Sequence, residues 1–265
     1  MPTLKKRFSD YAAGYYSNDD PVNQALRMKQ EHTHRVCRNA RMLANKLQLS
    51  GHDAALAETM ALLHDIGRFK QFAVYQTFKD ADSENHASLS VKEIKAHRML
   101  AGLDDADAAL VCEAISYHNA FAVPDPLSER ARFFLKLLRD ADKLDIWKVF
   151  GEYYENRKAA QTESVSLGLP DTQGYGREAV NAVLAGRLVR IQELENLHDF
   201  QLLQVSWIYD LNFVPTVVEM LEKGHMDRLQ AALPRSREMG EVFETVFRYA
   251  GRVLASTPAT TELVQ

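Results

Sequence analysis

The sequence contains little cysteine and no long hydrophobic run. Cys37 and Cys112 are its two cysteines in 265 residues, too few for the disulfide framework of a small secreted protein, so a cytoplasmic location is expected. The longest unbroken apolar run, residues 108–112, is far shorter than the ~20 residues that span a bilayer. The basic N-terminal segment is followed by no apolar stretch, so neither a secretory signal nor a membrane anchor is expected.

An excess of positive charge is also missing. The 32 Lys and Arg residues stand against 36 Asp and Glu residues, for a net charge of −4, and no binding to nucleic acid or to an anionic membrane is expected. At 46% hydrophobic residues the chain is long enough to bury a sizeable core. Its length fits one large domain or two smaller ones.

Strand-like alternation is absent as well, whereas helical periodicity recurs along the chain, which predicts an all-α fold. Residues 68–83 carry four aromatics without sustained periodicity and are expected to form a connecting loop, with Gly67 as the left-handed terminator of the preceding helix. Residues 164–176 are rich in glycine and mark the clearest break in the chain. The expected domains are residues 1–160 and 161–265, unless the two form a single domain. Helices are expected over residues 20–49, from Asp53 to before Gly67, over 83–100, 104–118 and 128–157, with Asp20, Asp53 and Ser83 as the N-caps of the first three. Two or three further helices are expected after these, one of them ended or kinked by Pro215.

The placement of the histidines is informative. His64 continues the buried face set by Leu56 and Met60, and Asp65 follows it directly. An imidazole and a carboxylate together on an apolar face are costly unless a partner compensates them, and a metal ion is one such partner.

Two other helices repeat this pattern. His32 lies on the inward stripe four residues before Val36, whereas His34 is rotated by about 200° and should face outward. His118 follows the stripe of Leu110 and Ala114. Each of these histidines alone is more often a core residue than a ligand, but three together favour a metal site. His86 has weaker periodic support. On the helix expected over residues 128–157, periodicity cannot choose between Asp142 and Asp145 as the ligand, although Asp145 lies closer to the apolar stripe of that helix.

Five ordered segments resemble the metal-binding signature of the HD-domain superfamily of metal-dependent phosphohydrolases. EHTHRV resembles its first segment, LLHDIGR its defining His-Asp pair and DADKLD its final aspartate segment, while NHASLSV and AISYHN are similar to the extra histidine segments of dinuclear members. The resemblance covers about residues 25–148. The Gly-Tyr-Pro triplet of the members that cleave cyclic di-GMP is missing, which argues against that substrate.

The resemblance implies an HD-type helical bundle over residues 1–160, a C-terminal helical extension and a dinuclear site. It assigns the final aspartate role to Asp142 and a bridging role to Asp65. Nitrogen and oxygen donors without thiolate suit Fe, Mn, Co, Ni or Zn. The implied function is cleavage of a nucleotide or another small phosphate ester by a metal-activated hydroxide. The six implied ligands are His32, His64, Asp65, His86, His118 and Asp142.

Three further residues are candidates for phosphate binding and catalysis. Arg68, three residues after Asp65, and Lys143 could contact phosphate or simply pair with the neighbouring carboxylates. Asn119 could bind substrate or cap its helix. Two other functions stay open: a mixed-valence diiron oxygenase, which uses the same six ligands, and a nucleotide-binding module without turnover. The remaining histidines, His34, His52, His97, His198 and His225, are expected to be surface or structural residues.

Overall fold

A computed structural model describes residues 3–155 and 169–256. The predicted all-α class is confirmed: in these two ranges the regular structure is helical, apart from one isolated β-bridge between Ala101 and Leu103. None of the described helices is long and apolar enough to span a membrane. The chain divides into two compact units, residues 1–145 and 146–265. The predicted domain boundary at 160/161 lies outside the described residues.

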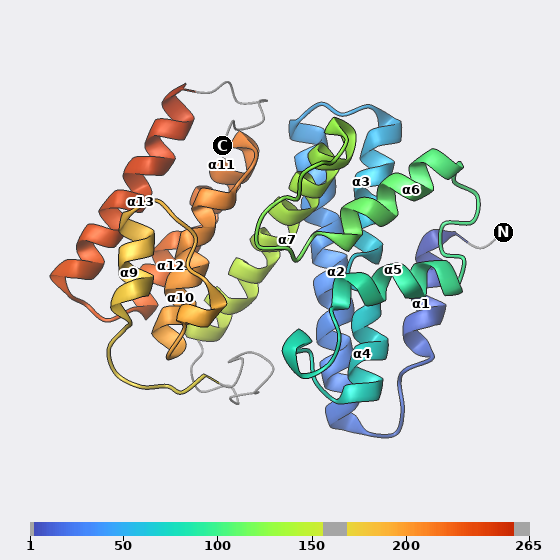
Figure 1. Cartoon of the computed structure of the whole chain (residues 1–265), viewed down its shortest axis with the longest axis horizontal. Helices are drawn as coiled ribbons and strands as arrows, with labels where there is room; N and C mark the ends of the chain where they lie inside the picture. The colour runs from blue at the N-terminus through green and yellow to red at the C-terminus, as the bar shows by residue number, and fades with distance from the viewer. Residues whose placement is uncertain (1–2, 156–168, 257–265) are drawn as a thin grey trace. The chain divides into compact units, whose positions relative to one another are not determined.

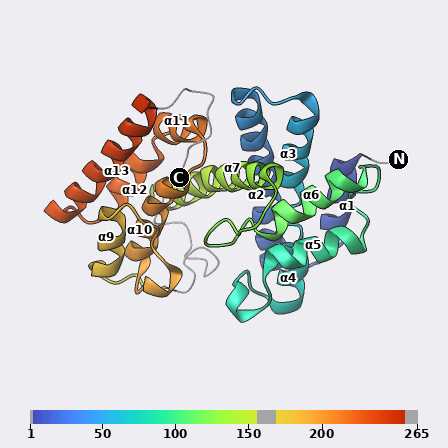
Figure 2. The ribbon, with the colours of Figure 1, turned by 45° about the horizontal axis from the view of Figure 1, so that its top comes forward.

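In the first unit, the long helix α2 (Asp20–Lys46) packs along α3 (Gly51–Leu63). Around this pair lie α1 (Leu4–Ala13), α4 (Gly67–Tyr75), α5 (His86–Ala96) and α6 (Asp105–Ser116) (Figure 1 and Figure 2). The first part of α7 (Glu129–Glu155) joins α2 through a hydrogen bond from Asn39 Nδ2 to the Ala141 carbonyl, 2.9 Å long. The core between these helices is apolar and includes the fully buried Phe8, Leu43, Met60 and Phe69.

The helix ends follow local capping chemistry, although several caps differ from those expected. Asp19, not Asp20, caps α2, and Ser50, not Asp53, caps α3 by accepting from the Asp53 N–H. Asn85, not Ser83, caps α5. Each cap residue supplies a side-chain oxygen to an N–H group that lacks a partner within its helix.

The prediction that residues 68–83 form a loop is wrong for its first half, because residues 67–75 form α4. Gly67 does not end a helix in a left-handed conformation either: it is the first residue of α4 and is not among the glycines with positive φ. A Cβ atom at Gly67 would lie 2.5 Å from the Ser90 backbone nitrogen. Glycine is therefore needed here for the close approach of α4 to α5. Residues 76–85 remain a loop, which contains the short helix η1 (Asp80–Asp82).

In the second unit, the described part of the chain contains the remainder of α7, five further helices and two short 3-10 segments. Trp147 of α7 is buried and donates a 3.0 Å hydrogen bond from Nε1 to the Gln204 carbonyl. Pro215 does not end or kink a helix, because it lies in the first turn of α11, where its missing N–H costs nothing. The elements are α9 (Arg177–Leu184), η2 (Ile191–Glu193), α10 (Leu197–Ser206), η3 (Trp207–Asp210), α11 (Val214–Glu222), α12 (His225–Ala232) and α13 (Arg237–Ser256).

Candidate metal centre

The first unit brings together the six residues that the sequence selected as ligands, called the donor cluster below. They come from five places in the chain: α2, the α3–α4 junction, the start of α5, the residues after α6, and α7. Asp65 lies at the centre, within 3.5–3.9 Å of the Nε2 atoms of all four histidines. The donor cluster consists of His32, His64, Asp65, His86, His118 and Asp142.

The four imidazole rings of the donor cluster are oriented in the same way. In each ring the Nδ1 atom faces an oxygen acceptor at 2.6–2.8 Å, so the proton of the neutral ring sits on Nδ1. In the neutral form of each ring, the Nε2 lone pair points into the cluster and can bind a cation, which is the arrangement found in metal-binding histidines. The acceptors are Asp145 for His32, the Ala61 carbonyl for His64, Asp80 for His86 and the Ile115 carbonyl for His118.

The inner atoms of the donor cluster lack the partners that buried polar atoms normally have. His64 Nε2 and Asp142 Oδ1 are buried without a hydrogen-bond partner, and they lie 3.9 Å apart. The Nε2 atoms of His86 and His118 face each other at 3.1 Å. Buried acceptors that face one another are costly, and a cation bound among them would remove this cost. The residues therefore fit a metal ion.

Two overlapping groups of three have donor atoms close enough to share an ion. His32, His64 and Asp142 form one, and His64, Asp65 and His118 form the other, with all donor atoms of a group within 4.8 Å of one another. His86 adjoins the second group, because its Nε2 lies 3.5 Å from Asp65 Oδ1.

Burial and charge set the protonation of the cluster. Burial lowers the pKa of His64 to about 4, and burial together with the Arg68 guanidinium lowers that of His86 to about 3, so both rings are neutral at neutral pH. Burial alone would lower the pKa of His32, but Asp142 and Asp145 raise it to about 9. Burial would raise the pKa of Asp65, yet Lys29, His64 and Arg68 hold it well below its usual value. A metal ion at His32 must therefore displace a proton.

The structure resolves the ambiguity between Asp142 and Asp145. Asp145, which lies closer to the apolar stripe, is 1% exposed and pairs with His32 Nδ1 and with Arg35 Nε at 2.6 Å. Asp142 instead directs Oδ1 toward the Nε2 atoms of His32, 3.2 Å away, and His64. Asp145 thus orients a ring, whereas Asp142 belongs to the donor cluster.

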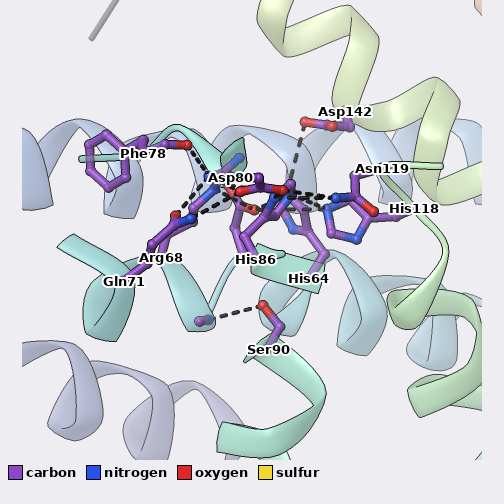
Figure 3. A network of polar contacts seen from close by, with 12 residues as sticks. His64, Arg68, Gln71, Phe78, Asp80, His86, Ser90, His118, Asn119 and Asp142 are labelled. Atoms are coloured by element: carbon purple, nitrogen blue, oxygen red, sulfur yellow. Dashed lines mark hydrogen bonds and ion pairs between the residues drawn. The ribbon is translucent and has the colours of Figure 1, made fainter. Parts of the chain in front are cut away.

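The 76–85 loop reaches the cluster through Asp80, a residue that sequence reasoning missed (Figure 3). Asp80 Oδ2 accepts from His86 Nδ1 at 2.6 Å and from Asn119 Nδ2 at 3.1 Å. Its Oδ1 accepts from Arg68 at 3.1 Å and from Gln71 at 2.9 Å. No helical periodicity marks a loop residue, so only the fold reveals this contact.

The other predicted candidates lie in or beside the same region. Arg68 places Nε 3.5 Å from Asp65 Oδ1, and Lys143 is buried next to Asp142 on α7. His34 is exposed as predicted. Sequence reasoning also missed Lys29, whose Nζ lies 3.2 Å from Asp65 Oδ2. Its position three residues before His32, on the same helix face, could have signalled it.

The fold and the donor cluster agree with a comparison against protein families. The model of the HD domain matches residues 30–147, a range that contains all six residues of the donor cluster. Residues 30–147 are therefore an HD domain. The matched range agrees closely with residues 25–148, over which the sequence motifs resemble those of the superfamily. No curated protein and no solved structure matches the chain.

Proposed function

We propose that this HD domain is a metal-dependent phosphohydrolase that cleaves a nucleotide or another small phosphate ester. The superfamily supports a metal-dependent hydrolase. The observation that carries the proposal is the common orientation of four buried imidazoles, each with Nδ1 held by an acceptor and Nε2 directed at Asp65. Such rings are prepared to bind a cation without rearrangement.

In this proposal, His32, His64 and Asp142 would hold one divalent ion, His86 and His118 would hold a second, and Asp65 would contribute to both as the bridging ligand. The donors are nitrogen and oxygen atoms without thiolate, a set that suits Fe, Mn, Co, Ni or Zn. When bound, such ions supply Lewis acidity toward phosphate oxygens and lower the pKa of water.

The chain's own side chains would orient the ligands and compensate the phosphate charge. Asp145 and Asp80 fix the His32 and His86 rings through their Nδ1 atoms. Arg68, Lys143 and Asn119 are proposed to face the substrate. The NH1 group of Arg68 is held by the 76–85 loop, so Arg68 would face the substrate with the Nε edge of its guanidinium.

The test combines elemental analysis with a substrate panel. Protein purified without chelator should contain transition metal, and it should release phosphate or nitrophenol from nucleotides, p-nitrophenyl phosphate or bis-p-nitrophenyl phosphate when Mn²⁺, Co²⁺ or Fe²⁺ is added. His32→Ala should lose metal and activity, whereas His34→Ala, a change two residues away on the exposed face of α2, should retain both. Metal loss in His34→Ala, with metal retained in His32→Ala, would show that His34 and not His32 is the ligand.

Anaerobic assays separate the remaining functions. A hydrolase keeps full activity without oxygen, whereas oxygen uptake with a mixed-valence iron signal would indicate the diiron oxygenase. Tight nucleotide binding by metal-loaded protein, without turnover of any substrate, would instead indicate a binding module.

A further inference from the structure

Lys29 is a partly buried cation at the donor cluster to which the proposed ligand set gives no role. It lies one turn before His32 on α2, and its side chain is 17% exposed. Its Nζ is 3.2 Å from Asp65 Oδ2 and 5.2 Å from the centre of the Phe78 ring. The aromatic ring belongs to the 76–85 loop, so the loop helps to hold the ammonium group beside Asp65.

Arg68 differs from Lys29 in how firmly it is held. Its NH1 donates to Gln71 Oε1, to the Phe78 carbonyl and to Asp80 Oδ1, at 2.5–3.1 Å. The guanidinium therefore ties the 76–85 loop to α4. Among the described residues, Asp65 is the single ion-pair partner of Lys29. Of the two cations next to Asp65, Lys29 is the one that can take another anion without breaking the loop.

A lysine at this position works against metal binding. Its ammonium group competes for Asp65 Oδ2 and repels a divalent cation over a few ångströms in a buried environment. This cost is offset if the lysine ammonium group pairs with a second anion once the Asp65 oxygens bind metal. An ammonium group is compact and offers three donors, which suits a phosphate oxygen.

We propose that Lys29 changes partners: it pairs with Asp65 in the metal-free protein and binds a phosphate oxygen of the substrate in the metal-loaded protein. This inference rests on the proposed function and assigns Lys29 as the main phosphate-binding side chain, with Arg68 holding the loop. The alternative role is purely structural, in which Lys29 only neutralises a buried carboxylate. The two roles predict different responses to its removal.

The test measures metal and phosphate binding separately in Lys29→Met, which keeps an unbranched side chain one atom shorter and removes its charge. Calorimetric titration of chelator-treated protein with Mn²⁺ should show binding that is unchanged or up to about tenfold tighter, because a competing cation is gone. Titration of the Mn²⁺-loaded protein with inorganic phosphate should show binding weakened about tenfold or more, because a charge-assisted hydrogen bond is lost. Lys29→Arg should recover part of the phosphate affinity. Arg27→Met, the same charge change at an exposed position of α2, should alter neither titration.

The two titrations distinguish a structural role of Lys29 from a role in phosphate binding. Parallel weakening of Mn²⁺ and phosphate binding in Lys29→Met, with a lowered unfolding temperature, would show that Lys29 is structural. Unchanged phosphate binding in Lys29→Met, with a wild type that binds phosphate, would overturn the inference and leave the proposed function standing. Absence of Mn²⁺ binding by the wild type, with other divalent metals equally inactive, would overturn both.

Discussion

The Nε2 atoms of His86 and His118 lie 3.1 Å apart, while the Nδ1 atom of each ring faces its own oxygen acceptor. Both protons are thereby directed outward, and two lone pairs meet inside the HD domain. The acceptors belong to the 76–85 loop and to the last turn of α6, so two separate elements cooperate in this orientation. Such a pair is ready to bind a cation, and the predictions on Asp65 and Asp80 follow from this arrangement.

Removing the proposed bridge should empty the site. We expect Asp65→Ala to lose most of its bound metal and all metal-dependent activity, because Asp65 adjoins every histidine of the donor cluster. Elemental analysis and the phosphate-release assay measure these losses. Asp82→Ala, a change at an exposed residue of η1, is the control. An Asp65→Ala protein with full metal content would contradict the bridging assignment.

Removing the partner of His86 should weaken one part of the site. Asp80→Asn is expected to reduce the metal affinity about 10–100-fold, the usual effect of losing a carboxylate that orients a metal-binding histidine. The metal content at saturation should fall more steeply for a second ion than for the first. Titration with Mn²⁺, with Asp82→Asn as the matched control, tests this. Equal affinity in Asp80→Asn and the wild type would mean that the His86 ring needs no such partner.

The close contact of α4 and α5 predicts a stability effect. Gly67→Ala would place a methyl group 2.5 Å from the Ser90 backbone nitrogen, and we expect a loss of about 1–3 kcal/mol in the free energy of unfolding. Gly51→Ala is the control, because nothing lies within 4 Å of a Cβ atom there. Urea unfolding of both variants measures the difference. Similar midpoints for Gly67→Ala and Gly51→Ala would show that the helices can separate at little cost.

Glu93, which lies outside the donor cluster, is expected to make the stability of the protein depend on pH. Its carboxylate is 3% exposed and accepts from Lys70 Nζ at 2.7 Å and Tyr11 Oη at 2.9 Å. Burial would raise its pKa, but these partners lower it below the usual 4.5. The stabilisation from ionised Glu93 is therefore complete above about pH 4.5 and is lost as the pH falls through the lowered pKa.

The variant Glu93→Gln isolates this contribution. We expect the metal-free wild type to be more stable than Glu93→Gln at pH 7, and the difference between them to shrink below pH 4.5. Chemical denaturation at several pH values, with both proteins kept metal-free, provides the measurement. A difference that stays constant from pH 7 to pH 3 would show that the Glu93 charge contributes nothing to folding.

Much of the donor cluster was predictable because it lies on helices or directly after their ends, in line with buried apolar stripes. His32 follows the inward stripe of α2, and His64 and His118 continue the stripes of α3 and α6 just past the ends of those helices. Periodicity alone therefore placed these three residues in the core, and it placed His34 outside. His86 and Asp142 needed the resemblance to the HD-domain superfamily. His86 begins its helix, where one turn gives little periodic signal, and Asp142 lies off the stripe that Asp145 follows.

The local sequence by itself determined the helical class, most of the helices and the inward histidines, because a period of 3.6 residues is set within a single segment. Only the tertiary structure decided the partners of those histidines, the contact of Lys29 with Asp65, and the need for glycine at position 67. These features depend on side chains from segments far apart in the chain, such as Asp145 and His32, that meet only after the helices pack. Asp80 is the clearest case, since a carboxylate in a loop has no period and gains its role from the ring that it holds.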